Sequence, residues 1–432
     1  MMQGRTSSRI LTPLGLAVCL SLLGDLTLYT VLVTQLDEVG LSLAAVGVML
    51  GINRLVRIPG NTLTGVLLDR WGRRRLFIFG MLLGVLSTAS YGLARGFWPF
   101  LVSRLAWGIA WTCINVGGMV MVLDISTRSN RGRLTGIYNT WLQAGLALSP
   151  LVGGFLVDTI SFRPAMLVCA GLTAIGLAVA VVALPETAQL AGGDTQQEPR
   201  PALRLDLRRR LNSISWRRTR GLLRGNRDLV ATSLLLLITL FAGEGVALST
   251  TSLLLQRHFG PAVVLGHLAL GVATAGGILL ALRSLLAGAV GPLAGHLSDA
   301  HTGRWPVIVG SLVIGAAGFG LLSFAASPAT IVLGVILGAV SGGAALATLA
   351  AQMGDLTPPG REGVVMGLYA TVGDVGSMAG PFLAFAMLSV VDLQWVYLLC
   401  TFGFLAGLGL IWRIHPSTRS TPVTCGQGDV LE

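Results

Sequence analysis

Twelve apolar segments, each long enough to cross a bilayer as a helix, dominate this chain of 432 residues. A helix needs about 20 mostly apolar residues to span a hydrocarbon core about 30 Å thick. The segments cover residues 11–36, 43–68, 76–94, 97–123, 134–157, 163–184, 229–257, 263–297, 306–326, 328–352, 363–390 and 393–414. Charged residues make up only 11% of the chain, against about 25% in soluble proteins. The sequence therefore predicts an all-α membrane protein with twelve transmembrane helices.

All thirty basic residues are arginine, and their distribution predicts how the chain is oriented. If the N-terminus is cytoplasmic, the cytoplasmic segments hold 23 arginines, and the opposite side holds only Arg95, Arg163 and Arg257. An excess of positive residues marks the cytoplasmic side of a membrane protein. We therefore expect a multi-pass protein of the plasma (cell inner) membrane with both termini in the cytoplasm. The net charge of +11 then reflects topology, and no nucleic-acid partner is expected.

A charged turn occurs twice, at Gly65–Arg75 and, in degraded form, at Gly295–Arg304. The copies lie 230 positions apart, and each connects two apolar segments. Asp124 and Asp355 recur at almost the same offset. Internal repeats of this kind are typical of transporters built from two similar halves. The repeat predicts two pseudo-symmetric six-helix bundles with a central cavity between them.

The predicted bundles are residues 1–184 and 229–414, joined by a linker at 185–228 and followed by a cytoplasmic tail at 415–432. The linker is rich in arginine, and its leucines recur at helical spacing. Two interpretations stay open. The linker either contains an amphipathic helix on anionic lipids of the inner leaflet, or it is solvated and its arginines enforce topology.

Several motifs resemble those of the major facilitator superfamily, and the resemblance covers nearly the whole chain. Gly65–Arg74 matches the family's loop signature G-x-L-x-D-R-x-G-R-R, and Arg104 lies in a stretch similar to its buried-arginine motif. Gly145–Gly154 resembles the exporter signature G-x-x-x-G-P-x-x-G-G, with Ser149 in place of one glycine. The resemblance implies two bundles that rock around a midplane site, as in the drug or metabolite:proton antiporters of the family.

The two charged turns are candidate latches between the bundles on the cytoplasmic side. Glycine permits a sharp turn, and a carboxylate can pair with arginine or with a helix N-terminus. A purely structural loop is the alternative interpretation. The candidate residues are Gly65, Asp69, Arg70, Gly72, Arg73, Arg74, Asp124, Arg133, Gly295, Asp299, Gly303 and Arg304. The small residues of the exporter-like motif, which allow close helix contact and a bend, are Gly145, Ser149, Pro150, Gly153 and Gly154.

Seven ionisable residues lie within the apolar segments. They are Asp25, Arg54, Arg57, Arg104, Glu244, Arg283 and Asp374. Each costs at least about 2.5 kcal/mol at mid-bilayer and needs a partner or a function. Helix rise places Asp25 level with Arg57, which predicts one ion pair there and a second between Glu244 and Arg283.

Two roles for these charges stay open. The pairs are static, or one carboxylate exchanges a proton as the bundles move. Asp25 and Glu244 are the leading proton carriers, and Asp374 is the third. Arg104 either holds an anionic group of a substrate or tunes Asp25.

Aromatic and amide side chains of the same helices are candidates for contact with a substrate, although packing is the default role for each. They are Tyr29, Asn53, Asn61, Trp107, Trp111, Tyr138, Trp141, Gln143 and Tyr369. The sequence contains no phosphate-binding loop and no Cys/His metal spacing, so we expect no catalytic residues, no metal and no cofactor besides a proton gradient.

The sequence therefore predicts a monomeric secondary transporter that exports a small lipophilic compound in exchange for protons. Uptake or uniport of a polar metabolite and lipid translocation are the alternatives. A sensor or scaffold protein that no longer transports is the last alternative.

Overall fold

The computed structural model describes residues 2–127, 130–187, 226–265, 268–357 and 362–414. Within this part, eleven helices are long and apolar enough to cross a membrane. A further helix, α15 (Glu362–Met387), has 26 residues. Large apolar side chains such as Val182, Phe402 and Trp98 are exposed on the helix surfaces, as expected where lipid replaces water.

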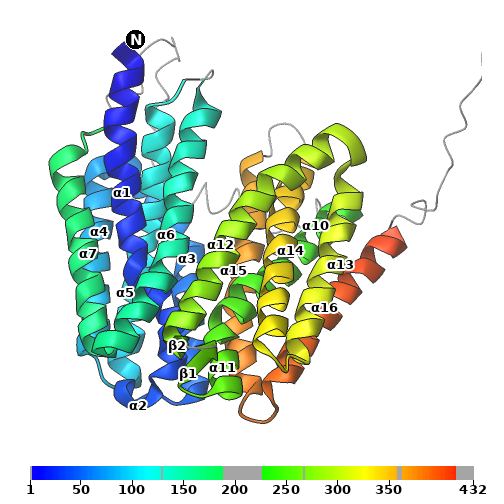
Figure 1. Ribbon diagram of the computed structural model, residues 1–432. Helices are drawn as coiled ribbons and strands as arrows, with labels where there is room; N and C mark the ends of the chain where they lie inside the picture. The colour runs from blue at the N-terminus through cyan, green and yellow to red at the C-terminus, as the bar shows by residue number, and fades with distance from the viewer. Residues whose placement is uncertain (1, 128–129, 188–225, 266–267, 358–361, 415–432) are drawn as a thin grey trace, which may run out of the picture.

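The first half of the chain forms one group of helices, coloured blue to green in Figure 1. Its elements are α1 (Met2–Val31), η1 (Leu32–Thr34), α2 (Leu36–Val39), α3 (Leu43–Trp71), α4 (Arg73–Leu93), α5 (Phe97–Asp124), α6 (Arg131–Ile160) and α7 (Phe162–Ala183). Gly72 separates α3 from α4 with a φ of 86°, a conformation that is open to glycine but costly for other residues.

The second half forms the other group, coloured green to red in Figure 1. Its elements are α10 (Arg227–Leu240), a π-helical turn η3 (Phe241–Ala247), α11 (Leu248–Phe259), β1 (Ala262–Leu265), β2 (Leu268–Gly271), α12 (Val272–Leu297), η4 (Ser298–Thr302), α13 (Arg304–Ser323), α14 (Pro328–Asp355), α15 and α16 (Leu393–Ile414). Helices α10 and α11 continue through η3 as one span of 33 residues.

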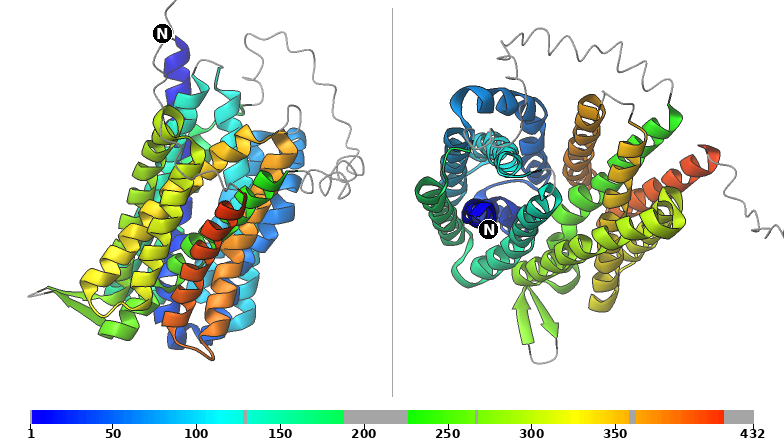
Figure 2. Two further views of the ribbon diagram at one scale, coloured as in Figure 1. Left: turned by 90° about the vertical axis from the view of Figure 1, so that its right-hand side faces the viewer. Right: turned by 90° about the horizontal axis from the view of Figure 1, so that it is seen from above.

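The structure corrects one predicted helix. The apolar run 263–297 was expected to be a single span, but residues 263–265 and 268–271 belong to two antiparallel strands in which Ala262 pairs with Gly271 and Leu265 with Leu268. Gly260, with a φ of 73°, ends α11 just before the hairpin. Valines 263 and 264 favour a strand over a helix because they are β-branched. Figure 2 shows the hairpin projecting sideways beyond the helices.

The two groups of helices touch mainly through α3 against α15 and α6 against α12. Figure 1 shows them meeting at the end that carries β1 and β2, the hairpin end, and diverging toward the other end. That other end carries the turns at Trp71–Arg75 and Ser298–Arg304 and is called the signature end. A Cβ added at Gly47, near the hairpin end of α3, would lie 2.7 Å from the carbonyl oxygen of Pro381, whereas one added at Gly65 would have no neighbour within 4 Å.

Candidate functional site

A carboxylate at the junction of the two groups, Glu244, lies between two arginines. Its Oε1 accepts a hydrogen bond from Nη2 of Arg283 at 2.8 Å, and its Oε2 lies 3.9 Å from Nη2 of Arg54. Arg283 belongs to the same half of the chain, and Arg54 to the other half. The Glu244 side chain is 30% exposed, more than that of either arginine. The predicted Glu244–Arg283 pair is therefore confirmed, and Arg54 is a second partner.

A second ion pair also crosses between the halves. Nη2 of Arg57 on α3 lies 3.3 Å from Oδ1 of Asp374 on α15. The Asp374 side chain is 10% exposed and that of Arg57 is 21% exposed. Arg54 and Arg57, three residues apart on α3, thus reach two different carboxylates of the second half. Separation of the halves would break both contacts.

The third carboxylate, Asp25, pairs with Arg104 and not with Arg57, so the predicted Asp25–Arg57 pair is wrong. Arg104 is fully buried within the first half, contacts Asp25, and donates from Nε to the carbonyl of Met49 at 2.6 Å. Its guanidinium also lies over the ring of Tyr29. The predicted pair rested on the depth of each residue along its helix, and depth does not give the direction in which a side chain points. Arg57 faces α15, and Arg104 fills the space beside Asp25.

The backbone around Glu244 departs from an α-helix. Residues Phe241–Ala247 form a π-helical turn, a feature that is often found at functional sites. Hydroxyl groups in the next helical turn donate to the carbonyls of this segment. Ser249 donates to Gly245 at 2.6 Å, Thr250 to Val246 at 2.8 Å and Thr251 to Ala247 at 2.6 Å. The sequence Gly243-Glu244-Gly245 supplies the small neighbours that leave the carboxylate accessible.

The first signature turn is held by carboxylates of its own half. Nε of Arg73 lies 3.3 Å from Oδ2 of Asp124, and the backbone N–H groups of Arg73 and Arg74 donate to Glu186 at 3.0 and 3.3 Å. Glu186 thus caps the N-terminus of α4, where a negative charge is favoured. Sequence reasoning missed this role, although Glu186 follows the proline that ends the sixth apolar segment. The side chain of Asp69 lies outside the described part of the structure.

The second signature turn repeats this arrangement. Arg304 contacts Asp299, and its Nε donates to Oδ2 of Asp355 at 3.0 Å. The Arg73–Asp124 and Arg304–Asp355 pairs therefore occupy matching positions in the two halves. Each pair joins segments of a single half, so a latch between the halves remains a prediction. The other predicted residues of the turns are exposed or adjoin open space: Arg70, Arg133, Gly65 and Gly295. Gly303 ends η4 with a φ of 75°.

The exporter-like motif on α6 faces two partners. Toward α1, the Ser149 hydroxyl donates to the carbonyl of Leu22 at 2.7 Å, and Gly145 and Gly153 lie against Cys19 and Thr27. Toward α12 in the other half, a Cβ on Gly154 would lie 2.2 Å from the carbonyl oxygen of Ala273. The carbonyl of Pro150 would be equally close to a Cβ on Gly277. The motif therefore brings the backbones of α6 and α12 into direct contact.

The nine predicted substrate-contact residues divide into two sets. Tyr29, Trp107, Tyr138 and Asn53 are buried, at 1%, 1%, 0% and 4% exposure, which fits packing within the first half. Trp111, Trp141, Gln143, Asn61 and Tyr369 are partly exposed. Gln143 lies close to Gly288 of α12, at the contact between the halves.

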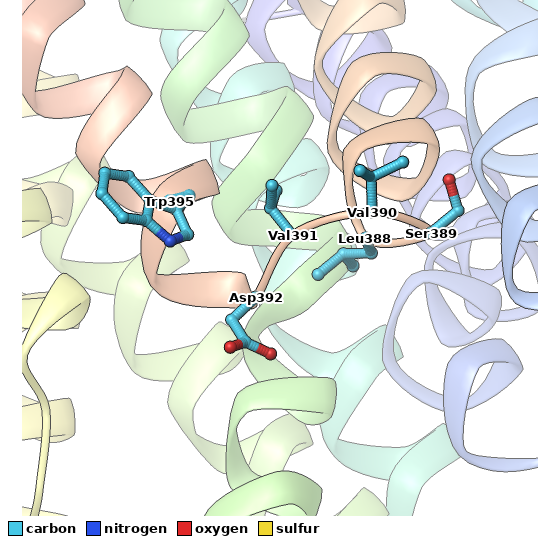
Figure 3. A pocket seen from close by; sticks show the side chains of 6 residues that line it. All are labelled: Leu388, Ser389, Val390, Val391, Asp392 and Trp395. Atoms are coloured by element: carbon cyan, nitrogen blue, oxygen red, sulfur yellow. The ribbon is translucent and has the colours of Figure 1, made fainter.

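A hollow of about 350 Å³ lies at the hairpin end, in the turn between α15 and α16 (Figure 3). It is lined by Leu388, Ser389, Val390, Val391, Asp392 and Trp395. This turn is fourteen residues beyond Asp374, about 21 Å along a helix. The hollow is therefore separate from the charged residues at the junction.

Comparison with known proteins shows which family has this architecture. The sequence profile described as Major Facilitator Superfamily matches residues 14–282 and 260–424. Multidrug resistance protein 1 of Bacillus subtilis (strain 168) is 28% identical over 131 residues, which are 30% of this chain and 34% of that protein. An uncharacterized MFS-type transporter of Mycobacterium tuberculosis is 26% identical over 417 residues, which are 94% of this chain and 53% of that protein. The chain thus spans about a third to about half of these relatives.

Solved structures show the same fold. A bacterial homolog of the human lysosomal transporter Spinster, crystallised in an inward-facing and unoccupied conformation, superposes with a TM-score of 0.73 at 18% identity and covers 96% of this chain and 99% of that one. The human organic anion transporter MFSD10 superposes with a TM-score of 0.65 at 19% identity, over 94% and 99% of the two chains. The profile, the helical fold and the repeated signature turns agree: the chain is a multi-pass membrane protein that belongs to the major facilitator superfamily.

Proposed function

We propose that this protein is a secondary transporter that exports a small lipophilic compound in exchange for protons, and that Glu244 carries the proton. The observation that carries the proposal is the position of Glu244 between Arg283 of its own half and Arg54 of the other. Rocking of the halves changes the distance to Arg54 and leaves Arg283 in place. A carboxylate that gains and loses a nearby arginine also changes its proton affinity. Proton binding is then linked to the conformational change.

The other two carboxylates have different roles in this proposal. Asp374 also faces an arginine of the opposite half, Arg57, and acts as the second proton-linked group. Asp25 is enclosed with Arg104 inside the first half, where rocking of the halves leaves the pair intact. It serves as a fixed ion pair. Export is supported by relatives named for multidrug resistance and by the exporter-like motif on α6.

The proposed setting follows the arginine distribution. The protein is a monomer in the plasma membrane, the signature end and both termini face the cytoplasm, and anionic lipids contact the arginine-rich linker. The linker at 188–225 lies outside the described residues. The halves meet at the hairpin end, so the conformation corresponds to a transporter open toward the cytoplasm. The mechanism is alternating access around the junction that holds the charges.

Proton release on substrate addition tests this proposal. In everted vesicles with an acidified lumen, adding ethidium or rhodamine 6G, two lipophilic probes, should discharge the pH gradient in the wild type, and Glu244→Gln should abolish the discharge. Asp392→Asn, which removes an exposed carboxylate at the hairpin end, is the matched control and should behave as wild type. Discharge at the wild-type rate in Glu244→Gln would exclude Glu244 as the carrier. Higher cellular accumulation of the probes on expression would indicate uptake instead of export.

A further inference from the structure

The π-helical turn that carries Glu244 is in direct backbone contact with α15. A Cβ added at Gly380 would lie 2.3 Å from Cα of Gly245 and 2.7 Å from the carbonyl oxygen of Phe241. A Cβ added at Gly245 would lie 2.6 Å from Cα of Gly380. Both residues of the contact must therefore be glycine, since no side chain fits between the two helices. Gly245 is the residue immediately after Glu244.

The same segment of α15 touches the other half of the protein on its opposite side. A Cβ on Gly47 of α3 would lie 2.7 Å from the carbonyl of Pro381, and one on Gly51 would lie 3.0 Å from that of Met378. Residues 378–381 are thus held between the π-helical turn and α3. The backbone of α15 at Pro381 is already in contact with α3, and the side chains of Phe382 and Phe385 pack tightly against Gly51 and Gly47. A change in the shape of the turn is therefore passed on to α3 with little slack.

We propose that Gly380 is a positioning residue for Glu244. Its contact with Gly245 holds the π-helical turn so that the Glu244 carboxylate reaches Arg283 and Arg54 together. When Glu244 takes up a proton and leaves the arginines, the turn shifts and displaces α15 against α3. This inference rests on the proposed role of Glu244 as proton carrier. It assigns α15 as the element through which that proton reaches the interface between the halves.

The charged groups around Glu244 come from three elements. Arg54 contacts it from α3 and Arg283 from α12, while Arg57, three residues further along α3, is paired with Asp374 of α15, six residues before Gly380. Two arginines thus contact the carboxylate, so a displacement of even about 1 Å changes its electrostatic environment. Proton affinity is therefore a sensitive measure of where the π-helical turn holds Glu244. Helix stability alone would not report it.

Infrared titration of the purified protein in lipid, without any substrate, tests the proposal. The difference between wild type and Glu244→Gln isolates the carboxyl band of Glu244. Gly380→Ala should change the proton affinity of Glu244 about tenfold, toward tighter binding, because the carboxylate is moved away from its arginines; tenfold corresponds to one pH unit in the midpoint.

Gly376→Ala is the matched control. It introduces the same methyl group on α15, at 2.7 Å from the carbonyl of Leu237, but contacts α10 before the π-helical turn. It should lower thermal stability and leave the Glu244 midpoint unchanged. Equal midpoints in Gly376→Ala and Gly380→Ala would overturn the proposal.

A milder pair of variants serves if Gly380→Ala does not fold. Ser249→Ala removes the hydroxyl that donates to Gly245 within the π-helical turn, and Thr239→Ala removes an equivalent hydroxyl bonded to Leu235 in α10. Ser249→Ala should shift the Glu244 midpoint in the same direction by a smaller amount, and Thr239→Ala should not. No shift in Ser249→Ala would overturn the proposal as well. If Glu244→Gln leaves the infrared titration unchanged, Glu244 exchanges no proton and the proposed function itself is wrong.

Discussion

At the scale of single residues, the ion pairs differ in whether they cross between the halves. Glu244 and Asp374 reach arginines of α3, whereas Asp25 pairs within the first half. The seven ionisable residues were located from their positions in apolar segments, and the Glu244–Arg283 pair was predicted correctly. The Asp25–Arg57 pair was not, because helix rise fixes the height of a side chain and leaves its direction open. Arg104 also makes a contact that no pattern announced, with the backbone carbonyl of Met49. Direction depends on packing between helices, which a single sequence does not specify.

The Asp25–Arg104 pair should be important for stability. Arg104→Gln leaves the Asp25 carboxylate buried without a counter-ion, and breaking one partner of a buried pair costs about 3–5 kcal/mol. We expect a large fall in the thermal unfolding temperature of the purified protein. The double variant Asp25→Asn/Arg104→Gln should recover part of the loss, because it buries no unpaired charge.

A control for this prediction is the exposed pair at the second signature turn. Arg304→Gln disrupts contacts with Asp299 and Asp355, whose side chains are 61% and 59% exposed. Exposed pairs contribute at most about 1 kcal/mol, so the unfolding temperature should change little. Similar losses in Arg304→Gln and Arg104→Gln would argue against a special role for the buried pair.

At the scale of elements, length and hydropathy predicted nearly all helices, and local backbone irregularities were missed. Residues 263–265 and 268–271 of the two strands were included in a predicted helix because they are as apolar as those of a span. The π-helical turn was also missed, since Phe241–Ala247 differs from an α-helix by one hydrogen-bond register and carries no distinct composition. In both features the backbone departs from an α-helix, and the pattern of apolar side chains does not show this departure.

The contact between α6 and α12 should control opening at the hairpin end. Gly154→Ala places a methyl group 2.2 Å from the carbonyl oxygen of Ala273, so the helices must separate and the open conformation gains population. Spin labels at Trp98→Cys and Val390→Cys, both exposed at this end, should report longer distances by pulsed electron resonance in a background without Cys425.

Gly136→Ala is the matched control on the same helix, because a Cβ there meets nothing within 4 Å. It should give the wild-type distance distribution. Unchanged distances in Gly154→Ala would show that the two helices can separate without disturbing the end of the protein.

At the scale of the whole molecule, the repeat in the sequence predicted the organisation into two similar halves. The Arg73–Asp124 and Arg304–Asp355 pairs sit at corresponding turns, as the offset between the copies implied. The repeat did not reveal that each pair stays within its own half, because symmetry relates the halves and says nothing of contacts between them. Those contacts depend on α3, α6, α12 and α15, whose facing residues differ between the copies.

The arginine bias predicts a single orientation in the membrane. Fusion of green fluorescent protein to the C-terminus should be fluorescent, and fusion of alkaline phosphatase at the same point should be inactive, because both report a cytoplasmic location. A phosphatase fusion after Arg95, between α4 and α5, should be active. The reverse pattern would place the signature end outside the cell and invert the direction of transport that we propose.

Backbone contact between α6 and α12 at Gly154 and Gly277 also bears on how the two sides of the membrane are kept apart. Dispersion attraction falls off within about 1 Å of separation. The hydrogen bonds that Asp158 of α6 accepts from the backbone N–H and the hydroxyl of Thr274 on α12, at 2.7 and 2.6 Å, are also lost as the helices part. If the contact between α6 and α12 opened slightly, most of the attraction would be lost before the gap was wide enough to admit water. Molecules in which α6 and α12 are only partly separated should therefore be scarce. The two helices should be either in contact or fully apart, so that few small ions leak passively across the membrane between them.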